Sequence, residues 1–459
     1  MNTRGWSFAQ IQRIMRGRWI NEPAHTGELC PFNGVAIDTR SIEPGQFFFA
    51  FVGEQVDGHA FVQTAIDAGA SVCVVSDEGK ITGELGVPVL VVDDVLDAMT
   101  NLAQAWRKKL NAKVIAITGS NGKTTTCRMV HTVCEQQGKA SCSIKSFNNA
   151  IGVPMTILNT PIDAEYLIAE VGTSSHGEVE ARTRLLKPDV SVIVSIGRAH
   201  LEELGGVDGV SREKSAIVRA MPVGGTAIVP TGVVSLDAEL DGIEDRTILH
   251  LDGAKQIHIE TDAGHSGSTR FLFDDELFTV PMLGKHSASN AAMAVMAARV
   301  LGIDDKLSRE GLARMSGPPM RFERVEIGKR IVYNDAYNAN PDSMRASLET
   351  FDQINTDSIK IAVLGEMLEL GDQSDLAHRS LIESFKAYPS IDRFILVGNE
   401  FARIRAASSK ICFVPSYDEQ SMGNIAEMFE SDAVVLLKGS RGVGLERIVY
   451  TLQRQAHTH

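Results

Sequence analysis

Short runs of β-branched and aromatic residues recur in the first hundred positions of the chain, separated by polar stretches that contain glycine. Such runs are typical of β-strands. They lie at residues 34–37, 46–51, 71–75 and 87–92. A helical pattern at 61–69 ends at Gly69, and a second one with apolar residues at helical spacing covers 95–110. The pattern predicts a small N-terminal α/β domain over residues 1–94, followed by a linking helix.

Uninterrupted apolar runs alternate with helical patterns through the middle of the chain. The runs lie at residues 114–117, 166–169 and 190–194. Strand–helix alternation with fully apolar strands predicts a mostly parallel sheet. Further on, two apolar runs flank a polar turn within 271–280 and predict an antiparallel hairpin, and an alanine-rich helix is predicted at 287–301. We place this central domain at 95–316.

A third region follows Gly317-Pro318-Pro319, which predicts a hinge because consecutive prolines break helices and stiffen a linker. Strand and helix patterns alternate again after it. The predicted strands lie at residues 330–333, 359–364, 393–397, 411–414 and 433–438. This alternation indicates a doubly wound, Rossmann-like domain at 317–459. The predicted fold class is therefore α/β with three domains, in keeping with 459 residues at roughly 150 residues per domain.

Composition and charge exclude several classes of protein. A hydrophobic content of 44%, a charged content of 22% and a mean hydropathy of -0.02 rule out a disordered chain. The net charge of -13 lacks the basic excess that a non-specific nucleic-acid binder needs. An acidic chain favours neutral or cationic ligands, so any anionic ligand must be held by local features such as helix N-termini and single cations.

The sequence also indicates the cellular compartment of the protein. No uncharged apolar run reaches about 18 residues, so no membrane span is expected. The segment Met1–Gln12 lacks the apolar core of a secretory signal. The six cysteines are too few for a disulfide scaffold and contain no Cys-x-x-Cys pair for zinc. We expect a reduced, cytoplasmic protein.

A glycine-rich loop joins the first central strand to the helix that follows it. It contains Gly119, Ser120, Asn121, Gly122, Lys123, Thr124 and Thr125. Backbone N–H groups of such a loop bind phosphate oxygens, with Lys123 on the phosphates and the Thr124 hydroxyl on Mg²⁺. The strict pattern places another glycine at position 117, which is Ile117 here. The loop predicts nucleotide phosphate binding but leaves kinases, motors, switches and ligases open.

Two polar residues follow the next two central strands. Glu170 ends one strand, and His200 comes shortly after the other. Since the carboxyl ends of parallel strands meet at one sheet edge, both are expected near the phosphate loop. A carboxylate there is suited to hold Mg²⁺. Alone, Glu170 also fits a solvated strand end, and a single histidine is more often structural.

Together these residues resemble the Mur ligase family. The matching segments are Thr118–Thr125, Glu170, Ile196–His200, Lys214, Gly284–His286 with Asn290, Asn334–Met344, Asp38–Arg40, Asp57–His59, Asn148–Pro154, Leu364–Gly371 and Leu437–Arg441. Within the family, the segment at 334–344 is most similar to the members that add D-alanyl-D-alanine. The match spans about Gly34 to Val449, which is nearly the whole chain.

The resemblance implies a function in peptidoglycan synthesis, and through it in cell-wall biogenesis, cell shape and division. The N-terminal domain would bind UDP, the central domain ATP, and the C-terminal domain would close over the nucleotide. The implied reaction is ATP-dependent amide formation between a UDP-linked muramoyl tripeptide and D-alanyl-D-alanine through an acyl phosphate. Its partners are these small molecules, with no nucleic acid, and a monomer is expected.

The resemblance also implies two Mg²⁺ ions. Their ligands would be Thr124, Glu170, His200 and Lys214, and the catalytic residues would be Lys123, Glu170, His200 and Lys214. In the family the lysine matching Lys214 is carbamylated, which turns a cation into an anionic oxygen ligand. Spacing alone instead favours an exposed lysine on the amphipathic stretch 211–218. Two neighbouring positions depart from the family, since Ser195 replaces a usual Asn and Ala216 a usual Glu.

Nucleotide and substrate contacts are likewise implied by position in the family pattern. Nucleotide contacts are expected at His286, Asn290, Arg321, Asp335, Tyr337 and Asn338, and substrate contacts at Thr39, Arg40, Asn148 and Asn149. Lys438 and Arg441 fall near the expected place of the incoming dipeptide. Two alternatives remain at this stage: a sister ligase that adds another amino acid or dipeptide, and a nucleotide-binding regulatory ATPase without ligase activity.

Overall fold

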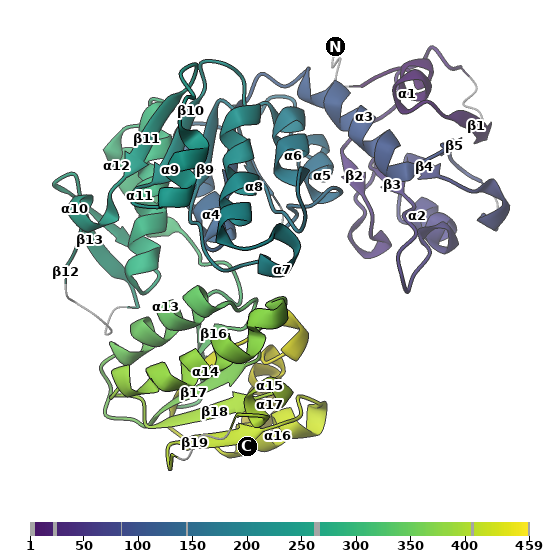
Figure 1. Cartoon of the computed structure of the whole chain (residues 1–459). Helices are drawn as coiled ribbons and strands as arrows, with labels where there is room; N and C mark the ends of the chain where they lie inside the picture. Colours follow the sequence, from purple (N-terminus) through teal and green to yellow (C-terminus); the bar gives the residue numbers. More distant parts are fainter. Residues whose placement is uncertain are drawn as a thin grey trace.

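The strands of the described residues form four sheets, which are arranged along the chain in three regions (Figure 1). The structure is a computed structural model that describes residues 5–21, 25–83, 85–143, 146–260, 267–404 and 408–457. Within those ranges, none of the helices combines the length and the apolar character that crossing a bilayer requires.

The N-terminal region has a five-stranded sheet in the order β1-β5-β4-β3-β2. β1 is antiparallel to β5, and the remaining pairs are parallel. All four predicted strands and the helix at 61–69 are confirmed, whereas α1 and β1 were not predicted. The elements are α1 (Phe8–Met15), β1 (Arg18–Asn21), β2 (Val35–Ala36), η1 (Thr39–Ser41), β3 (Phe47–Phe49), η2 (Gly58–Phe61), α2 (Val62–Asp67), β4 (Val72–Val75), η3 (Glu78–Lys80), β5 (Val89–Val91) and the linking helix α3 (Val95–Arg107).

The central region has a six-stranded parallel sheet in the order β11-β10-β9-β6-β8-β7 and a three-stranded antiparallel sheet, β12-β13-β14. The predicted parallel sheet, hairpin and alanine-rich helix are confirmed. The elements are β6 (Lys113–Thr118), α4 (Lys123–Cys134), β7 (Ala140–Cys142), α5 (Gly152–Leu158), β8 (Tyr166–Glu170), α6 (Glu178–Leu186), β9 (Val190–Ile193), α7 (Leu201–Leu204), α8 (Val207–Ala220), β10 (Thr226–Pro230), α9 (Val234–Leu240), β11 (Thr247–Leu251), α10 (Gly253–Gln256), β12 (Ile257–Glu260), β13 (Thr269–Phe273), β14 (Glu276–Val280), α11 (Lys285–Val300) and α12 (Asp305–Arg314).

The C-terminal region has a six-stranded sheet in the order β15-β16-β20-β17-β18-β19. The first pair, β15 and β16, is antiparallel and the rest are parallel, so the predicted Rossmann-like alternation is confirmed with one added edge strand. The elements are β15 (Glu323–Ile327), β16 (Arg330–Asp335), α13 (Pro341–Asp352), β17 (Lys360–Gly365), η4 (Gly371–Gln373), α14 (Ser374–Ser384), η5 (Phe385–Ala387), β18 (Arg393–Val397), α15 (Asn399–Ala402), β19 (Ile411–Val414), α16 (Glu419–Glu427), β20 (Val434–Lys438), η6 (Arg441–Val443) and α17 (Glu446–His457).

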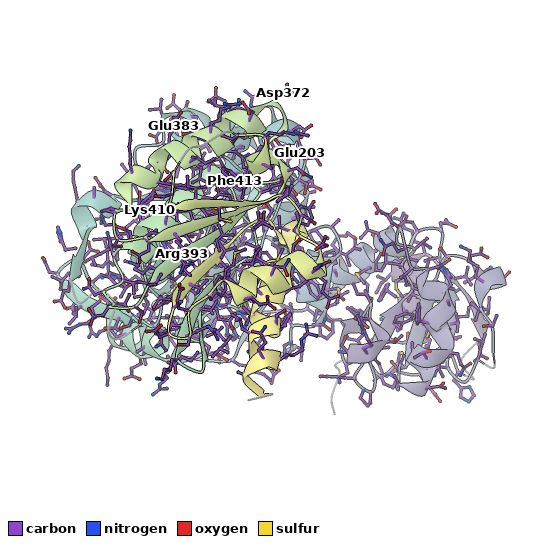
Figure 2. The ribbon with its side chains drawn as sticks, turned by 90° about the horizontal axis from the view of Figure 1, so that it is seen from below. Glu203, Asp372, Glu383, Arg393, Lys410 and Phe413 are labelled. Atoms are coloured by element: carbon purple, nitrogen blue, oxygen red, sulfur yellow. The ribbon has the colours of Figure 1, made fainter. Side chains whose placement is uncertain are left out.

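The three regions do not have three separate cores. One apolar cluster runs from Trp6 and Leu90 of the N-terminal region to Val153 and Leu167 of the central region. The C-terminal region has clusters of its own on the two faces of its sheet. The predicted domain divisions at 94/95 and 316/317 fall between sheets and stay predictions. Figure 1 shows the central region adjoining both of the others, and Figure 2 shows the N-terminal region standing to one side of the C-terminal region.

Candidate active site

The carboxyl ends of three neighbouring central strands, β6, β8 and β9, lie side by side at one edge of the sheet. β6 lies between β8 and β9, with Ile117 paired to Glu170 and Thr118 paired to Ile193. The phosphate loop after β6 therefore lies beside Glu170 and beside the loop that follows β9. This is the edge at which parallel α/β sheets bind ligands.

The phosphate loop is shaped by close packing against its neighbours. Gly122 has φ 83° and begins helix α4. A Cβ on Gly122 would lie 2.7 Å from Asn290 Oδ1 and 2.8 Å from Val194 Cγ1, so glycine is required for conformation and for space. Lys123 donates from Nζ to the Gly119 carbonyl at 2.8 Å. Its pKa is lowered, mainly because the ammonium is removed from water.

Glu170 is 1% exposed and is held on both carboxylate oxygens. Thr124 Oγ1 donates to Oε2 at 2.8 Å, and Asn148 Nδ2 donates to Oε1 at 2.6 Å. Ser146 Oγ lies 3.2 Å from the Thr124 hydroxyl. Gly172 is required here, because its Cβ would lie 2.6 Å from the Asn148 amide carbon. The contacts fix the carboxylate beside the phosphate loop.

This donor set fits a hard divalent cation. It offers hydroxyl and carboxylate oxygens from Thr124, Ser146 and Glu170 at the mouth of a phosphate loop. Across the described ranges, no cluster of three or more His, Cys, Asp or Glu side chains forms a metal centre of its own. Mg²⁺ is typically bound through one or two carboxylates together with substrate phosphates, so a single carboxylate is sufficient.

The C-terminal region contributes an arginine to the same point. Arg321 Nη2 donates to Thr124 Oγ1 at 3.0 Å. Its guanidinium also lies over the Tyr337 ring, 4.0 Å from the centroid, which fixes its orientation. Arg321 and Lys123 therefore bring two positive charges to the phosphate loop from different regions of the chain.

Asp335 lies at the end of β16, and both of its carboxylate oxygens have protein partners. Ser347 Oγ donates to its Oδ2 at 2.6 Å and Lys438 Nζ lies 3.0 Å from the same oxygen. The Phe322 backbone N–H donates to its Oδ1 at 3.2 Å. Lys438 is 4% exposed and also donates to the Asn338 carbonyl at 2.8 Å. These bonds hold the loop after β16 against the end of β20.

A cavity of about 650 Å³ contains most of the predicted site. Its lining includes Ser120, Asn121, Gly122, Lys123, Thr124, Thr125, Asn148, Asn149, Glu170, His200, His286, Asn290, Arg321, Asp335, Tyr337 and Asn338. Lys438 belongs to the lining, whereas five predicted residues lie outside it: Thr39, Arg40, Gly119, Lys214 and Arg441. Arg40 is exposed in η1 and pairs with Asp38 at 2.6 Å, in the N-terminal region.

The cavity lining also contains apolar side chains. Leu251, Met282 and Met293 line it together with Asn290 and His286. Burial lowers the pKa of His286, so its imidazole is neutral near pH 7. Apolar side chains, an amide and an imidazole together offer a planar base both stacking surface and hydrogen-bonding groups.

Lys214 is buried, so the expectation of an exposed lysine from the helical spacing is wrong. It lies on α8 and is 1% exposed, because this face of the helix packs on the central core. Among the described residues its ammonium has no hydrogen-bond or ion-pair partner. Burial, together with the nearby Lys123 charge, lowers its pKa to about 7. A substantial fraction of Lys214 is therefore a neutral, nucleophilic amine at pH 7.

His200 contacts the C-terminal region. Its Nδ1 lies 3.1 Å from Glu369 Oε2, and the imidazole lowers the pKa of that carboxyl. Both residues have left-handed backbone, with φ 55° and 62°. The neighbouring segments α7 and η4 also meet, at the edge where Figure 2 labels Glu203 and Asp372. No hydrogen bond or ion pair in the described part of the chain joins His200 to Glu170.

Ser195, the first departure from the family pattern, braces the phosphate loop. Its Oγ accepts from the Asn121 N–H at 2.9 Å and donates to the Asn121 carbonyl at 3.1 Å. The second departure, Ala216, is buried on α8, two residues after Lys214. Sequence reasoning missed Ser146, Asn340 and Asp342 as site residues. Asn340 and Asp342 belong to the first turn of α13 and lie within the matching segment 334–344, but the segment does not show which of its residues reach the central region. Ser146 and Asp342 line the cavity, and Asn340 contacts Asn121.

The fold and the cavity define a nucleotide-binding protein whose phosphate loop is completed by a second α/β region. Family models match the chain at residues 31–107 (Mur ligase family, catalytic domain), 117–298 (Mur ligase middle domain) and 320–441 (Mur ligase, glutamate ligase domain). The chain belongs to the Mur ligase family.

Individual relatives resemble it over nearly its whole length. The UDP-N-acetylmuramoyl-tripeptide–D-alanyl-D-alanine ligase of Bacillus subtilis is 33% identical, over 96% of this chain and 97% of that protein. The structure of MurF from Acinetobacter baumannii matches with a TM-score of 0.82 at 28% identity, over 98% of this chain and 99% of that one. MurF ligase from Thermotoga maritima, solved in complex with ADP, matches with a TM-score of 0.76 at 26% identity, over 93% and 98% of the two chains.

Proposed function

We propose that this chain is an ATP-dependent ligase that joins D-alanyl-D-alanine to UDP-N-acetylmuramoyl-tripeptide. The observation that carries the proposal is the Thr124–Glu170–Arg321 contact, which brings two regions together at a phosphate loop. The names of the full-length relatives supply the substrates. The product, a UDP-muramoyl pentapeptide, belongs to peptidoglycan synthesis, and soluble UDP-linked substrates fit a cytoplasmic enzyme.

The chemistry begins with an inert group. A carboxylate does not react with an amine, so its oxygen first attacks the γ-phosphorus of ATP, giving an acyl phosphate and ADP. Two anions must approach, and the positive charges of Lys123 and Arg321 lower that repulsion. A Mg²⁺ held by Thr124 and Glu170, with Ser146 beside them, would supply further positive charge on the phosphates.

The second step forms the amide bond. The free amine of D-alanyl-D-alanine attacks the acyl carbon, the tetrahedral intermediate collapses, and inorganic phosphate leaves. Water competes with the amine for the acyl phosphate, so the site must be closed. Tyr337, Asn338 and Asp335 enter the cavity from the C-terminal region and help to exclude water.

Lys214 is proposed to be carbamylated. A neutral amine attacks CO₂ and loses one proton, which replaces a buried cation by an anionic oxygen ligand. The pKa of about 7 and the absence of a partner within the described residues support this, because the charged amine is costly where it stands. With Glu170 and His200, the carbamate would hold a second Mg²⁺ and so complete the proposed catalytic residues.

The remaining substrate contacts are assigned by region. We propose that Thr39 and Arg40, in the N-terminal domain, contact uracil and phosphate of the UDP group. Asn149 Oδ1 accepts from the backbone N–H of Gly152, the first residue of α5, at 2.8 Å, and Asn149 lines the cavity with Asn148. Both are proposed to face the muramoyl peptide, and residues 1–94, 95–316 and 317–459 to act as three domains.

The test is phosphate release by the purified protein with ATP, Mg²⁺ and UDP-N-acetylmuramoyl-tripeptide. D-alanyl-D-alanine is expected to stimulate release and to appear in the product by mass spectrometry. Free D-alanine, L-alanine and D-glutamate, offered separately, are the controls. Stimulation by one amino acid but not by the dipeptide would indicate a sister ligase, and hydrolysis independent of the UDP-linked acceptor would indicate a regulatory ATPase.

Carbamylation is tested without turnover. After equilibration with ¹³C-bicarbonate, the wild-type protein is expected to show a carbamate carbon resonance that is missing in Lys214→Met. Lys360→Met is the matched control, since Lys360 is also buried but donates to two backbone carbonyls and to Ser390. Identical spectra of the wild type and Lys214→Met would exclude the modification.

A further inference from the structure

The first turn of α13 connects the C-terminal region directly to the phosphate loop. Asn340 is the N-cap of α13, and its Oδ1 accepts from the Ser343 backbone N–H at 2.9 Å. The same side chain reaches across to the central region, where Nδ2 donates to Asn121 Oδ1 at 2.8 Å. Asn121 Nδ2 points back to Asn340 Oδ1 at 3.4 Å. One side chain therefore caps a helix and contacts the phosphate loop.

The contact is buried and its partner is rigid. Asn340 is 5% exposed, so an unpaired amide there would carry a desolvation cost. On the loop side, the backbone N–H and carbonyl of Asn121 are both engaged by Ser195 Oγ. Asn121 therefore has a fixed backbone, and its side chain is free to respond to the position of α13.

A second bond from the same turn reaches the next loop. Asp342 Oδ2 accepts from the Arg198 backbone N–H at 2.8 Å. Gly197 lies so close that a Cβ there would be 2.8 Å from the same carboxylate oxygen. The start of α13 thus seats on the loops that follow both β6 and β9, which are the loops that form the cavity.

We infer that Asn340 is a positioning residue that couples docking of the C-terminal region to the geometry of the phosphate loop. The inference rests on the proposed function only in that the loop binds nucleotide phosphates. When the C-terminal region moves away, Asn121 loses its amide partner and the loop loses a restraint. By linkage, a docked region that strengthens nucleotide binding is itself favoured by bound nucleotide, by the same factor.

Two substitutions separate coupling from helix capping. Asn340→Ser keeps an N-cap of comparable quality but is too short to reach Asn121. Asn121→Ala removes the loop side of the pair and leaves the backbone bonds to Ser195. Each is expected to weaken binding of ADP and of a non-hydrolysable ATP analogue about 5- to 10-fold, in line with the loss of one buried hydrogen bond. The double variant is expected to lose no more than either single one.

The control is Asp418→Ser, which exchanges the N-cap of α16, where Asp418 accepts from the Ser421 N–H at 2.7 Å. It is expected to leave nucleotide affinity unchanged. Urea unfolding of Asn340→Ser should match the wild type, which excludes a structural explanation. Small-angle scattering should show less nucleotide-dependent compaction in Asn340→Ser than in the wild type.

These measurements use nucleotide alone, so they do not depend on ligase activity. If Asn340→Ser binds nucleotide within twofold of the wild type, or if the two single effects multiply in the double variant, the inference is wrong. The phosphate-release assay of the proposed function is unaffected by either outcome, because failure there concerns the acceptor and the dipeptide.

Discussion

The central region meets its two neighbours through interfaces of different kinds. On the N-terminal side one apolar cluster is continuous across the boundary, and Phe32 stacks edge-on between Phe47 and Trp106, with ring centroids 5.0 Å apart in both pairs. On the C-terminal side Leu283 reaches into the neighbouring core, but the contacts around the cavity are polar. They are Arg321–Thr124, Asn340–Asn121, Arg198–Asp342 and His200–Glu369.

The difference indicates which interface moves. Separating an apolar interface exposes hydrocarbon to water at roughly 25 cal/mol per Å². Polar contacts near a solvent-filled cavity exchange protein partners for water at a much smaller net cost. The N-terminal and central regions should therefore behave as one body, and the C-terminal region should open and close. Catalysis needs this arrangement, because substrates must enter the cavity and water must then be excluded.

The largest loss of unfolding free energy is expected from Trp106→Ala, at the apolar interface. Trp106 is 4% exposed and its indole N–H donates to the Thr160 carbonyl at 3.0 Å. Deleting it should cost about 3–5 kcal/mol of unfolding free energy. The protein has three tryptophans, Trp6, Trp19 and Trp106, so the fluorescence of the remaining two still reports this interface during urea unfolding.

Phe394→Ala, in the C-terminal core, is the control and should leave the fluorescence transition in place. An unchanged fluorescence transition in Trp106→Ala would contradict the shared core.

The second-largest effect is expected on the pH dependence of the unfolding free energy, through Lys214. The pKa of Lys214 is about 7 in the folded chain and near 10.5 when unfolded. Between these values the unfolded state binds a proton that the folded state does not, so stability rises with pH. In CO₂-free buffer, the unfolding free energy of the wild type relative to Lys214→Met should increase by about 1 kcal/mol per pH unit above pH 7. A flat difference from pH 7 to 9.5 would show that the amine stays charged in the fold.

A smaller effect is expected where a single polar contact reinforces the apolar interface. Asn159 Oδ1 accepts from the Val35 N–H at 2.7 Å, and its Nδ2 donates to the Val35 carbonyl at 3.1 Å. Asn159→Ala should lower the unfolding free energy by about 1–2 kcal/mol, because it leaves strand β2 with an unpaired edge. Asn159→Asp keeps the acceptor for the Val35 N–H but sets a carboxylate oxygen against the Val35 carbonyl, so it should lose at least as much stability. A smaller loss in Asn159→Asp than in Asn159→Ala would show that the acceptor alone carries the contact.

The smallest change in stability is expected at the polar interface. Glu369 is 58% exposed on its side chain, and exposed ion pairs contribute about 0–1 kcal/mol. The unfolding free energy of Glu369→Gln should therefore lie within about 1 kcal/mol of the wild-type value. Its small-angle scattering should shift toward an arrangement in which the C-terminal region has moved away from the central region. A loss comparable to that of Asn159→Ala would remove the contrast between the two interfaces.

Element types were predictable because they depend on local patterns. The hairpin at β13 and β14 was visible from two apolar runs around Asp274-Asp275, and these two residues adopt φ 50° and 65° in the turn. By contrast, α1 was missed although it has a capping box from Ser7 and Gln10. The apolar face of α1 is stabilised only by packing against α3, which is far away in the sequence.

Site residues were predictable where a motif places several of them together. The phosphate loop from Gly119 to Thr125 follows from spacing and a strand–helix context alone. Ser146 lies outside the matching segments, and Asn340 lies within the segment 334–344 without a role of its own there. Their contacts with Thr124 and Asn121 depend on loops that the fold brings together. The burial of Lys214 was misjudged for the same reason, since a helical pattern indicates a face but not what covers it.

The sequence by itself determined the α/β class, the order of the elements, the phosphate loop and the family. These depend on residue types and spacings within a few tens of positions, where backbone geometry is limited. The tertiary structure decided that Arg321 contacts Thr124, that Asn340 contacts Asn121, and that the Lys214 side chain is buried. Each joins or buries groups far apart in sequence, and only the packing of the regions on one another brings them within hydrogen-bonding distance or removes solvent.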